Sequence, residues 1–298
     1  MEPLSDQRAD SYLSYLGLSK SKPTLEYLDE LIKVHLERVT FENLDVLLNR
    51  RVSLDAEAVL LKVTGRGRGG YCYELNSIFG RLLKALGYGV HLRAARLRLG
   101  IPDDSAQRTR LSHMVLLVEL ADGECFIVDV GMAQCGLYRA LPLVGDAAPF
   151  RVRKLGATNN AFEVSVPRED GGWKVFYVVE PYDLDWLDFG VLNWYSSTHP
   201  DSSMRRLLLA GRRSPHGDGC WVRLVNDRFV RWSPKGGVVE RRVMLDENDI
   251  LEILRTEFGL NLSTADDVAP LRVRLREMFG SWRLGQDLFL KKLLWPEG

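Results

Sequence analysis

The residue that first suggests chemistry is Cys72, because four glycines, at positions 65, 67, 69 and 70, precede it and a helical pattern follows it. The thiolate is the reactive form of cysteine, so a nucleophilic cysteine needs a lowered pKa. Unpaired N–H groups and the dipole at a helix N-terminus favour an anion, and glycines allow backbone turns that side chains forbid. A small buried cysteine that only opens a core helix is the more common case. Cys72 is therefore a candidate nucleophile, and it needs a base and a group that orients the base.

His113 is the candidate base, because it lies at the head of a predicted strand whose hairpin partner contains Asp129. The aspartate follows an apolar run, FIV, and a buried carboxylate there needs a partner such as an imidazole N–H. In such a triad Asp129 orients the ring and His113 takes the proton of Cys72. The thiolate then attacks a carbonyl carbon and forms a thioester in a two-step, ping-pong reaction. The remaining histidines are more typical of structural or solvated residues: His35, His91, His199 and His216.

The length of one turn tests this hypothesis. If residues 121–123 form a three-residue turn with Gly123 in the left-handed region, Leu120 faces Glu124 and Asp129 faces Val115. His113 then lies one diagonal step from Asp129 on the same face, roughly 7 to 8 Å away at Cα. A two-residue turn would place the two side chains on opposite faces. The triad therefore predicts the three-residue turn.

The overall composition is that of an ordinary globular protein. The 298 residues include 40 Lys and Arg against 40 Asp and Glu, so the formal net charge is zero. This balance argues against a strongly basic nucleic-acid binder and against a protein held to acidic membranes by bulk charge. With 46% hydrophobic and 27% charged residues, the chain is expected to fold, into about two domains on length alone.

The cysteines and the N-terminus indicate a cytoplasmic protein. The four cysteines, at 72, 125, 135 and 220, contain no C-x-x-C pair and are too sparse for a disulfide scaffold, so they are interpreted as reduced thiols. The N-terminus lacks the apolar core of a signal peptide, and no stretch approaches the roughly 18 uncharged apolar residues of a membrane span.

The spacing of hydrophobic residues predicts the helices and strands that position Cys72, His113 and Asp129. Leucines and isoleucines three and four residues apart predict a helix after Pro23 and Thr24, and a second helix that contains Cys72 in its first turn and ends at Gly87. From about residue 90 the pattern alternates, which predicts strands at 90–97, 111–120, 124–130, 161–167 and 173–180. A three-stranded meander over 220–245 and helices at 246–258 and about 266–279 complete the chain. This order predicts an α+β protein of three compact parts.

Several sequence elements together resemble the arylamine N-acetyltransferase family. They are FENLD at 41–45, RGGYCYELN at 68–76, SHMVLLV at 112–118, VDVG at 128–131, NWYSSTHPDS at 193–202 and LREMFG at 275–280. The resemblance covers nearly the whole chain, and Arg-Gly-Gly-x-Cys followed in order by His and Asp is specific.

The resemblance implies a fold, a reaction and a set of contacts. The expected fold is a helical bundle at 1–90 that carries the cysteine, a β-barrel-like domain at 91–205 that carries His and Asp, and an α/β lid at 206–298, around a thiol-protease-like core. The expected reaction passes an acetyl group from acetyl-CoA through Cys72 to an arylamine, hydrazine or N-hydroxyarylamine, as in xenobiotic metabolism, without a metal. The residues implied in CoA binding are Ser112, Gly131, Tyr195 and Ser203, and Glu42 is expected to pair with Arg68.

Two positions differ from the family pattern. Met132 stands where the family has a phenylalanine beside the acceptor, and Met204 stands where phenylalanine is expected. A thioether still fills an apolar pocket and contacts aromatic rings, so the arylamine interpretation holds while the acceptor range is left open.

Alternatives remain open at this stage. Relatives that use other acyl-CoAs, such as malonyl-CoA, or that close macrolactams as amide synthases share the triad. A thiol protease or transglutaminase uses the same chain order, and a noncatalytic binding module is a further possibility. A zinc site of Cys72, Cys135, His113 and Asp129 is disfavoured because the spacing contains no short ligand pair.

The remaining features have simpler interpretations. Cys125 and Cys220 are interpreted as packing residues, and Cys135 follows Asp129 in a loop that could approach the site. The basic cluster at 205–213 is interpreted as solvated surface, with CoA 3′-phosphate binding as the alternative. The sequence predicts no nucleic-acid partner and leaves the oligomeric state open.

Overall fold

The computed structural model describes residues 1–298 except 99, 103–104, 106, 133–136, 144, 157–159, 168–170, 234–236, 264 and 285–298.

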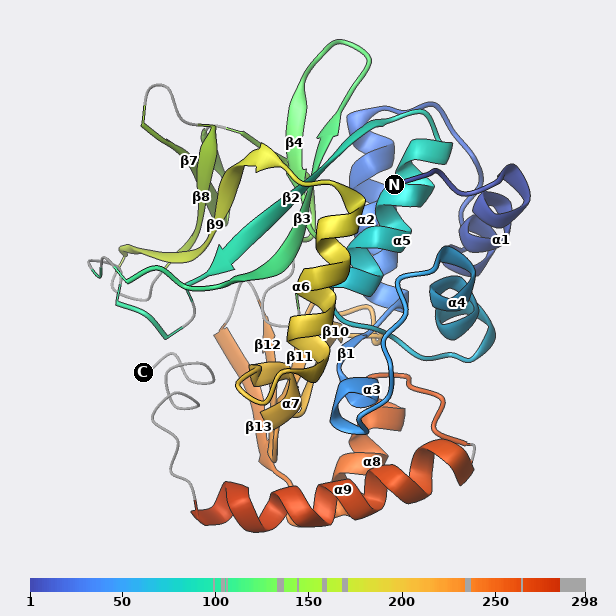
Figure 1. The fold of residues 1–298 in the computed structure, drawn as a ribbon, viewed down its shortest axis with the longest axis vertical. Helices are drawn as coiled ribbons and strands as arrows, with labels where there is room; N and C mark the ends of the chain where they lie inside the picture. The colour runs from blue at the N-terminus through green and yellow to red at the C-terminus, as the bar shows by residue number, and fades with distance from the viewer. Residues whose placement is uncertain are drawn as a thin grey trace.

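The N-terminal part of the chain is helical. This part is drawn in blue and cyan in Figure 1 and comprises α1 (Asp6–Leu16), α2 (Leu25–Arg38), α3 (Leu44–Leu47), α4 (Ala56–Leu60), a π-helical turn (Leu61–Gly65) and α5 (Cys72–Ala85). Helix α2 begins where predicted, because the Thr24 side chain accepts a hydrogen bond of 3.3 Å from the backbone N–H of Tyr27.

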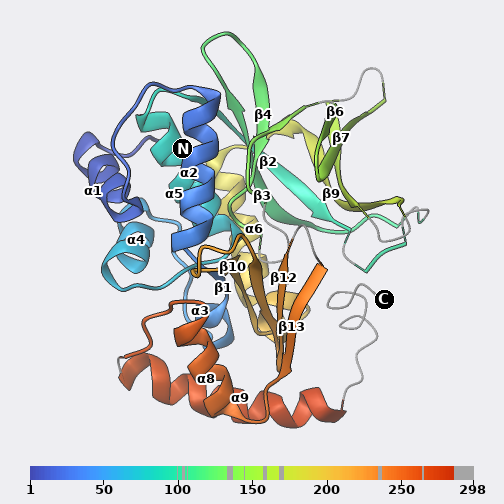
Figure 2. The ribbon, with the colours of Figure 1, turned by 180° about the vertical axis from the view of Figure 1, so that it is seen from behind.

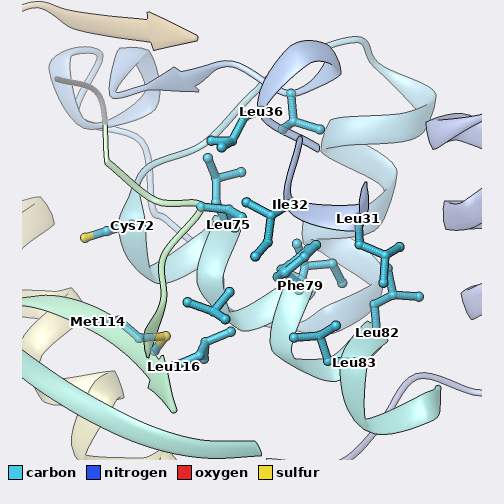
Figure 3. Close-up of a cluster of buried hydrophobic side chains, with 14 of the residues drawn as sticks. Leu31, Ile32, Leu36, Cys72, Leu75, Phe79, Leu82, Leu83, Met114 and Leu116 are labelled. Atoms are coloured by element: carbon cyan, nitrogen blue, oxygen red, sulfur yellow. The ribbon is translucent and has the colours of Figure 1, made fainter. Parts of the chain in front are cut away.

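Helix α5 lies at the centre of the main hydrophobic core. Its apolar residues pack against α2 on one side and against the barrel strands on another, as Figure 3 shows for Ile32, Phe79 and Leu116. Each fully buried leucine or phenylalanine contributes about 1.5–3 kcal/mol relative to exposure. This packing fixes the helix, and with it the position of Cys72, its first residue.

The middle of the chain forms an eight-stranded antiparallel sheet that nearly closes into a barrel. The strand order is β5-β4-β3-β2-β9-β8-β7-β6, and the edge strands β5 and β6 lie in contact. Apolar side chains from several strands fill the interior of the barrel, among them Val115, Ile127 and Val164. The strands are β2 (Gly89–Leu97), β3 (Leu111–Glu119), β4 (Cys125–Val128), β5 (Leu141–Pro142), β6 (Gly145–Ala147), β7 (Phe150–Leu155), β8 (Ala161–Pro167) and β9 (Trp173–Asp183).

The turn between β3 and β4 has the predicted three-residue form. The backbone N–H of Leu120 donates to the carbonyl of Glu124 at 2.9 Å, and Gly123 has φ of +87°. The strand register pairs Leu116 with Val128. Extending that register places Asp129 opposite Val115, so the predicted pairing is confirmed.

A second sheet and two helices form the C-terminal part. The meander predicted at 220–245 is confirmed as three consecutive antiparallel strands, and two further strands extend its edge, giving the order β1-β10-β11-β12-β13. The strands are β1 (Phe41–Glu42), β10 (Leu209–Arg213), β11 (Trp221–Val225), β12 (Arg228–Ser233) and β13 (Gly237–Val243), and the helices are α8 (Glu247–Thr256) and α9 (Ala265–Leu284).

Two features join the parts of the molecule. Strand β1 comes from the N-terminal part but pairs with β10, with Phe41 opposite Gly211, which is the junction seen in Figure 2. Helix α6 (Trp186–Thr198), followed by α7 (Ser203–Arg206), runs between the barrel and the second sheet in Figure 1. The boundaries at 90/91 and 205/206 stay predictions. None of the described helices combines the length and apolar character needed to cross a membrane.

Candidate active site

Cys72 lies at the edge of the hydrophobic core. Its side chain is near the cluster in Figure 3, but the sulfur is directed away from the surrounding leucines. The residue is 5% exposed, and its Sγ lies 3.9 Å from the carbonyl oxygen of Ser112. Ser112 directly precedes His113 on β3, so the start of α5 meets the start of β3 at this point.

The structure brings His113 and Asp129 together with Cys72. His113 Nε2 and Asp129 Oδ2 are 2.6 Å apart, and both residues are buried. Burial lowers the pKa of His113, but the charge and hydrogen bond of Asp129 and the hydrogen bond of Cys72 outweigh it and raise the pKa to about 10. The site therefore favours the charged, imidazolium form of His113 beside the sulfur of Cys72.

The buried carboxylate of Asp129 is held by three donors. While Oδ2 accepts from His113, Oδ1 accepts from Asn76 Nδ2 and from the backbone N–H of Gly131, both at 2.9 Å. A carboxylate in an apolar environment is costly unless such partners replace water. These hydrogen bonds explain how Asp129 is accommodated with no exposed surface.

A network of buried and half-buried charges lies beneath the glycine-rich segment that leads to Cys72. Arg68 donates to Glu42 Oε1 at 2.8 and 3.0 Å, so the pairing implied by the resemblance is present. Lys62 joins Asp45 at 2.6 Å and Glu74 at 2.8 Å. Burial lowers the pKa of Lys62, but three neighbouring carboxylates, with Glu74 the strongest, raise it above its usual value. This network anchors the segment beside the candidate nucleophile.

Close backbone approach explains two glycines near the site. A Cβ on Gly69 would lie 1.8 Å from the carbonyl oxygen of Thr40, where the segment runs along β1. A Cβ on Gly131 would lie 2.7 Å from Cys72 Cα and 2.7 Å from Asn76 Nδ2. Side chains are therefore excluded at both positions, and Gly131 lies directly against the nucleophile.

The four residues implied in CoA binding differ in their distance from the triad. Ser112 and Gly131 contact it directly, as described. Tyr195, on α6, stacks on His199 with ring centroids 4.4 Å apart, and the guanidinium of Arg110 lies over its ring at 5.5 Å. Because Arg110 directly precedes β3, Tyr195 lies beside the strand that carries His113. Ser203 begins α7, and none of the hydrogen bonds found among the described residues joins it to the triad.

Other predicted positions have separate surroundings. Met132 is 7% exposed and packs in the barrel core, while Met204 is half-buried at the margin of the main core. Cys72, Cys125 and Cys220 are free thiols, and Cys135 lies outside the described residues. In the described part of the chain, no three metal-ligating side chains are grouped to hold an ion.

The basic cluster at 205–213 is not simply a solvated surface. Arg212 is 8% exposed and donates to the carbonyl of Phe258 at 2.9 Å, so it holds the chain after α8. Nε of Arg213 lies 3.7 Å from Oε1 of Glu37, so the two side chains form an ion pair. These two arginines therefore have structural partners, which the sequence pattern did not distinguish.

Comparison with known proteins decides the family. A family model described as N-acetyltransferase matches residues 24–268. The arylamine N-acetyltransferase / N-hydroxyarylamine O-acetyltransferase of Salmonella typhimurium is 33% identical over 247 residues, which cover 81% of this chain and 84% of the relative. The chain belongs to the arylamine N-acetyltransferase family.

Solved structures of arylamine N-acetyltransferases have the same fold. The Salmonella typhimurium enzyme superposes with a TM-score of 0.82 at 29% identity, covering 92% of this chain and 100% of that one. The Mycobacterium marinum arylamine N-acetyltransferase in complex with CoA gives a TM-score of 0.81 at 28% identity, covering 90% and 98%. The predicted family and α+β fold class are confirmed, and the chain is an enzyme of this family.

Three residues of this arylamine N-acetyltransferase family member were not singled out from its sequence. Asn76 hydrogen bonds to Asp129, Arg110 lies over Tyr195, and the ring of Tyr177 lies 5.6 Å from that of His113. Asn76 had a signal, because it follows Cys72 by four residues and so shares its helix face. Arg110 and Tyr177 had none, because their contacts arise from packing between distant segments.

Proposed function

We propose that this protein transfers an acetyl group from acetyl-CoA to an arylamine, arylhydrazine or N-hydroxyarylamine through an acetyl-Cys72 thioester. The observation that carries the proposal is the series of contacts from Cys72 to His113 to Asp129 at the start of α5. The Salmonella typhimurium relative, named for N-acetyl transfer to arylamines and O-acetyl transfer to N-hydroxyarylamines, supports this substrate class.

In the first half-reaction the Cys72 thiolate attacks the carbonyl carbon of the acetyl-CoA thioester. The tetrahedral intermediate expels the CoA thiolate, and the imidazolium of His113 supplies the proton that CoA takes with it. Asp129 keeps the ring oriented and stabilises its charged form before the proton leaves. The products are free CoA and acetyl-Cys72.

In the second half-reaction the amine nitrogen attacks the carbonyl carbon of acetyl-Cys72. Neutral His113 takes the proton that the nitrogen loses, while the C–S bond breaks and returns its electron pair to sulfur. The acetylated amine leaves, and the thiolate–imidazolium pair is regenerated. The same histidine thus acts as acid in one half-reaction and as base in the other. The acetyl-Cys72 thioester stores the acetyl group between them and so separates donor and acceptor binding in time.

We also propose which residues contact CoA. Ser112 and Gly131 are proposed to line the approach of the pantetheine, because both lie against Cys72. Tyr195 is proposed to contact CoA from α6, and Ser203 from the start of α7. The CoA complex of the Mycobacterium marinum enzyme, whose fold this chain shares, supports the donor class.

A two-stage experiment tests the reaction. The protein is mixed with acetyl-CoA alone, and intact mass followed by peptide mapping is expected to show one acetyl group on Cys72. CoA release is then measured for acetyl-, propionyl- and malonyl-CoA with and without an arylamine, and sustained release is expected only when acetyl-CoA and amine are both present. Release only with another donor would overturn the acetyl assignment, and modification of Cys135 would overturn the nucleophile.

A further inference from the structure

One buried amide connects the three parts of the candidate triad. Asn76 lies on α5 four residues after Cys72 and has no exposed surface. Its Nδ2 donates to the carbonyl of Met114 at 2.7 Å and to Asp129 Oδ1 at 2.9 Å, while its Oδ1 accepts from the backbone N–H of Val130 at 2.9 Å. Both N–H donors and the carbonyl oxygen of the amide are therefore used.

The partners of this amide are the neighbours of the reacting residues. Met114 directly follows His113 on β3, and Val130 directly follows Asp129 after β4. A single side chain on the helix that begins with Cys72 thus holds the backbone of β3, which carries the base, and of the segment after β4, which carries its carboxylate. The helix and the hairpin have no covalent connection near this point, since Asn76 and Asp129 are 53 residues apart.

The amide also limits how the carboxylate of Asp129 can turn. Oδ1 is occupied by Asn76 and by the N–H of Gly131, so Oδ2 is the atom left to face His113 Nε2 at 2.6 Å. Gly131 permits this arrangement, because a Cβ there would lie 2.7 Å from Asn76 Nδ2. Rotation of the carboxylate would break two hydrogen bonds in a dry environment, where each is costly to lose.

We propose that Asn76 is a positioning residue, whose amide sets the register of Cys72 against His113 and holds the Asp129 carboxylate in the orientation that receives the histidine ring. This inference rests on the proposed catalytic triad. An amide suits the role because its two donors face two acceptors. An aspartate at position 76 would direct oxygen toward the Met114 carbonyl and Asp129. A leucine would remove the amide's hydrogen bond from each of the three buried partners.

Two variants and one matched control test the proposal. Asn76→Ala removes the amide, and Asn76→Ser leaves a polar space in which water can satisfy the backbone groups, so that the fold is kept if the alanine variant does not fold. Ser77→Ala is the control, because Ser77 is the next residue of α5, is 1% exposed, and its hydroxyl donates within its own helix to the carbonyl of Glu74 at 2.9 Å. Circular dichroism and thermal unfolding are used to check that each variant is folded.

The first readout is the alkylation rate of Cys72 by iodoacetamide as a function of pH, together with the burst of CoA release. At neutral pH both rates are expected to fall about 10- to 100-fold in the Asn76 variants, the effect of losing one hydrogen bond to a charged group. The alkylation rates are expected to approach that of the unmodified protein at high pH, where the thiol ionises without help. The KM for acetyl-CoA and the rates of Ser77→Ala are expected to stay within about twofold, because neither depends on the amide.

The second readout is the titration of the His113 ring, followed by NMR of the folded protein. Loss of Asn76 is expected to move the midpoint of the His113 titration to lower pH. The Asp129 carboxylate can then turn away from the ring and stabilises the imidazolium less. Asn76 variants that keep the alkylation profile and the His113 midpoint, and lose only melting temperature, would overturn the proposal in favour of a structural role. Absence of acetyl-Cys72 in the unmodified protein would instead overturn the proposed function, and the NMR titration separates the two failures because it requires no turnover.

Discussion

Two buried polar clusters flank the start of α5, and they differ in what their groups are left to do. The ionic network of Glu42, Asp45, Lys62, Arg68 and Glu74 pairs each cation with carboxylates, and every member comes from the N-terminal part. The proposed triad takes Cys72 from a helix and His113 and Asp129 from a hairpin of the barrel. Its carboxylate accepts from three donors and its ring is oriented, while its sulfur points away from the core. In the ionic network every charge has a partner, so we expect the network to contribute stability. In the proposed triad the sulfur of Cys72 is left available at the end of the Asp129–His113 contact, so we expect it to react.

The largest effect should follow from breaking the triad. His113→Gln removes the acid and base, and CoA release with acetyl-CoA and an arylamine is expected to fall by at least about 10³-fold, as in other nucleophilic triads. Steady-state kinetics measure the loss. The control is Cys125→Ala, which removes a half-buried thiol on β4 and should retain activity. An equal loss in the control would show that the assay reports damage to the barrel.

Breaking the ionic network should reduce stability and leave the chemistry of the remaining folded molecules intact. Arg68→Ala leaves Glu42 buried without its cation, which typically costs about 3–5 kcal/mol of unfolding free energy. Urea denaturation measures this loss of unfolding free energy. Arg66→Ala serves as the control, because Arg66 is exposed and its replacement should change stability by less than about 0.5 kcal/mol. If Arg68→Ala retained stability but lost the acetyl-Cys72 burst, the division between the two clusters would be wrong.

The pH dependence of stability should distinguish the triad from the network. The pKa of His113 is about 10 in the folded protein and 6.5 as a reference. The folded state therefore holds a proton that the unfolded state releases, and this stabilisation is complete below pH 6.5 and is lost as the pH rises toward 10. Between pH 7.5 and 9 the loss is at most about 2 kcal/mol. Urea denaturation of the unmodified protein and of His113→Gln at both pH values measures it, and identical slopes for the two proteins would contradict the assignment.

The smallest effect concerns the turn that aligns the triad. Gly123 has φ of +87°, and nothing lies within 4 Å of a Cβ placed there. Gly123→Ala should therefore cost about 1 kcal/mol through backbone conformation alone. Thermal unfolding measures the cost, and the acetylation burst should persist if the three-residue turn is kept. Loss of the burst without loss of stability would show that the turn has slipped and separated Asp129 from His113.

Much of the geometry of the proposed triad could be predicted from the sequence because its determinants are local. The glycines and the helical spacing place Cys72 at a helix start, and the length of one turn places His113 and Asp129 on one face of a hairpin. What spacing could not show is that the start of α5 meets the start of β3. That meeting depends on how α2, α5 and the barrel pack, and in the sequence only the resemblance to a family predicts it.

Local sequence specifies the helices and strands, their hydrophobic periodicity and the register of the hairpin, because helix periodicity, caps and turn chemistry act over a few residues. Which polar groups share a buried environment depends on the packing of these elements. The amide of Asn76 reaches Asp129 and the backbone of two strands, β1 completes a sheet built from residues after 208, and Arg110 lies over Tyr195. These contacts join segments that are far apart in the chain, and they exist because burying the apolar faces of α5 and the barrel brings those segments together and excludes the water that would otherwise satisfy their polar groups.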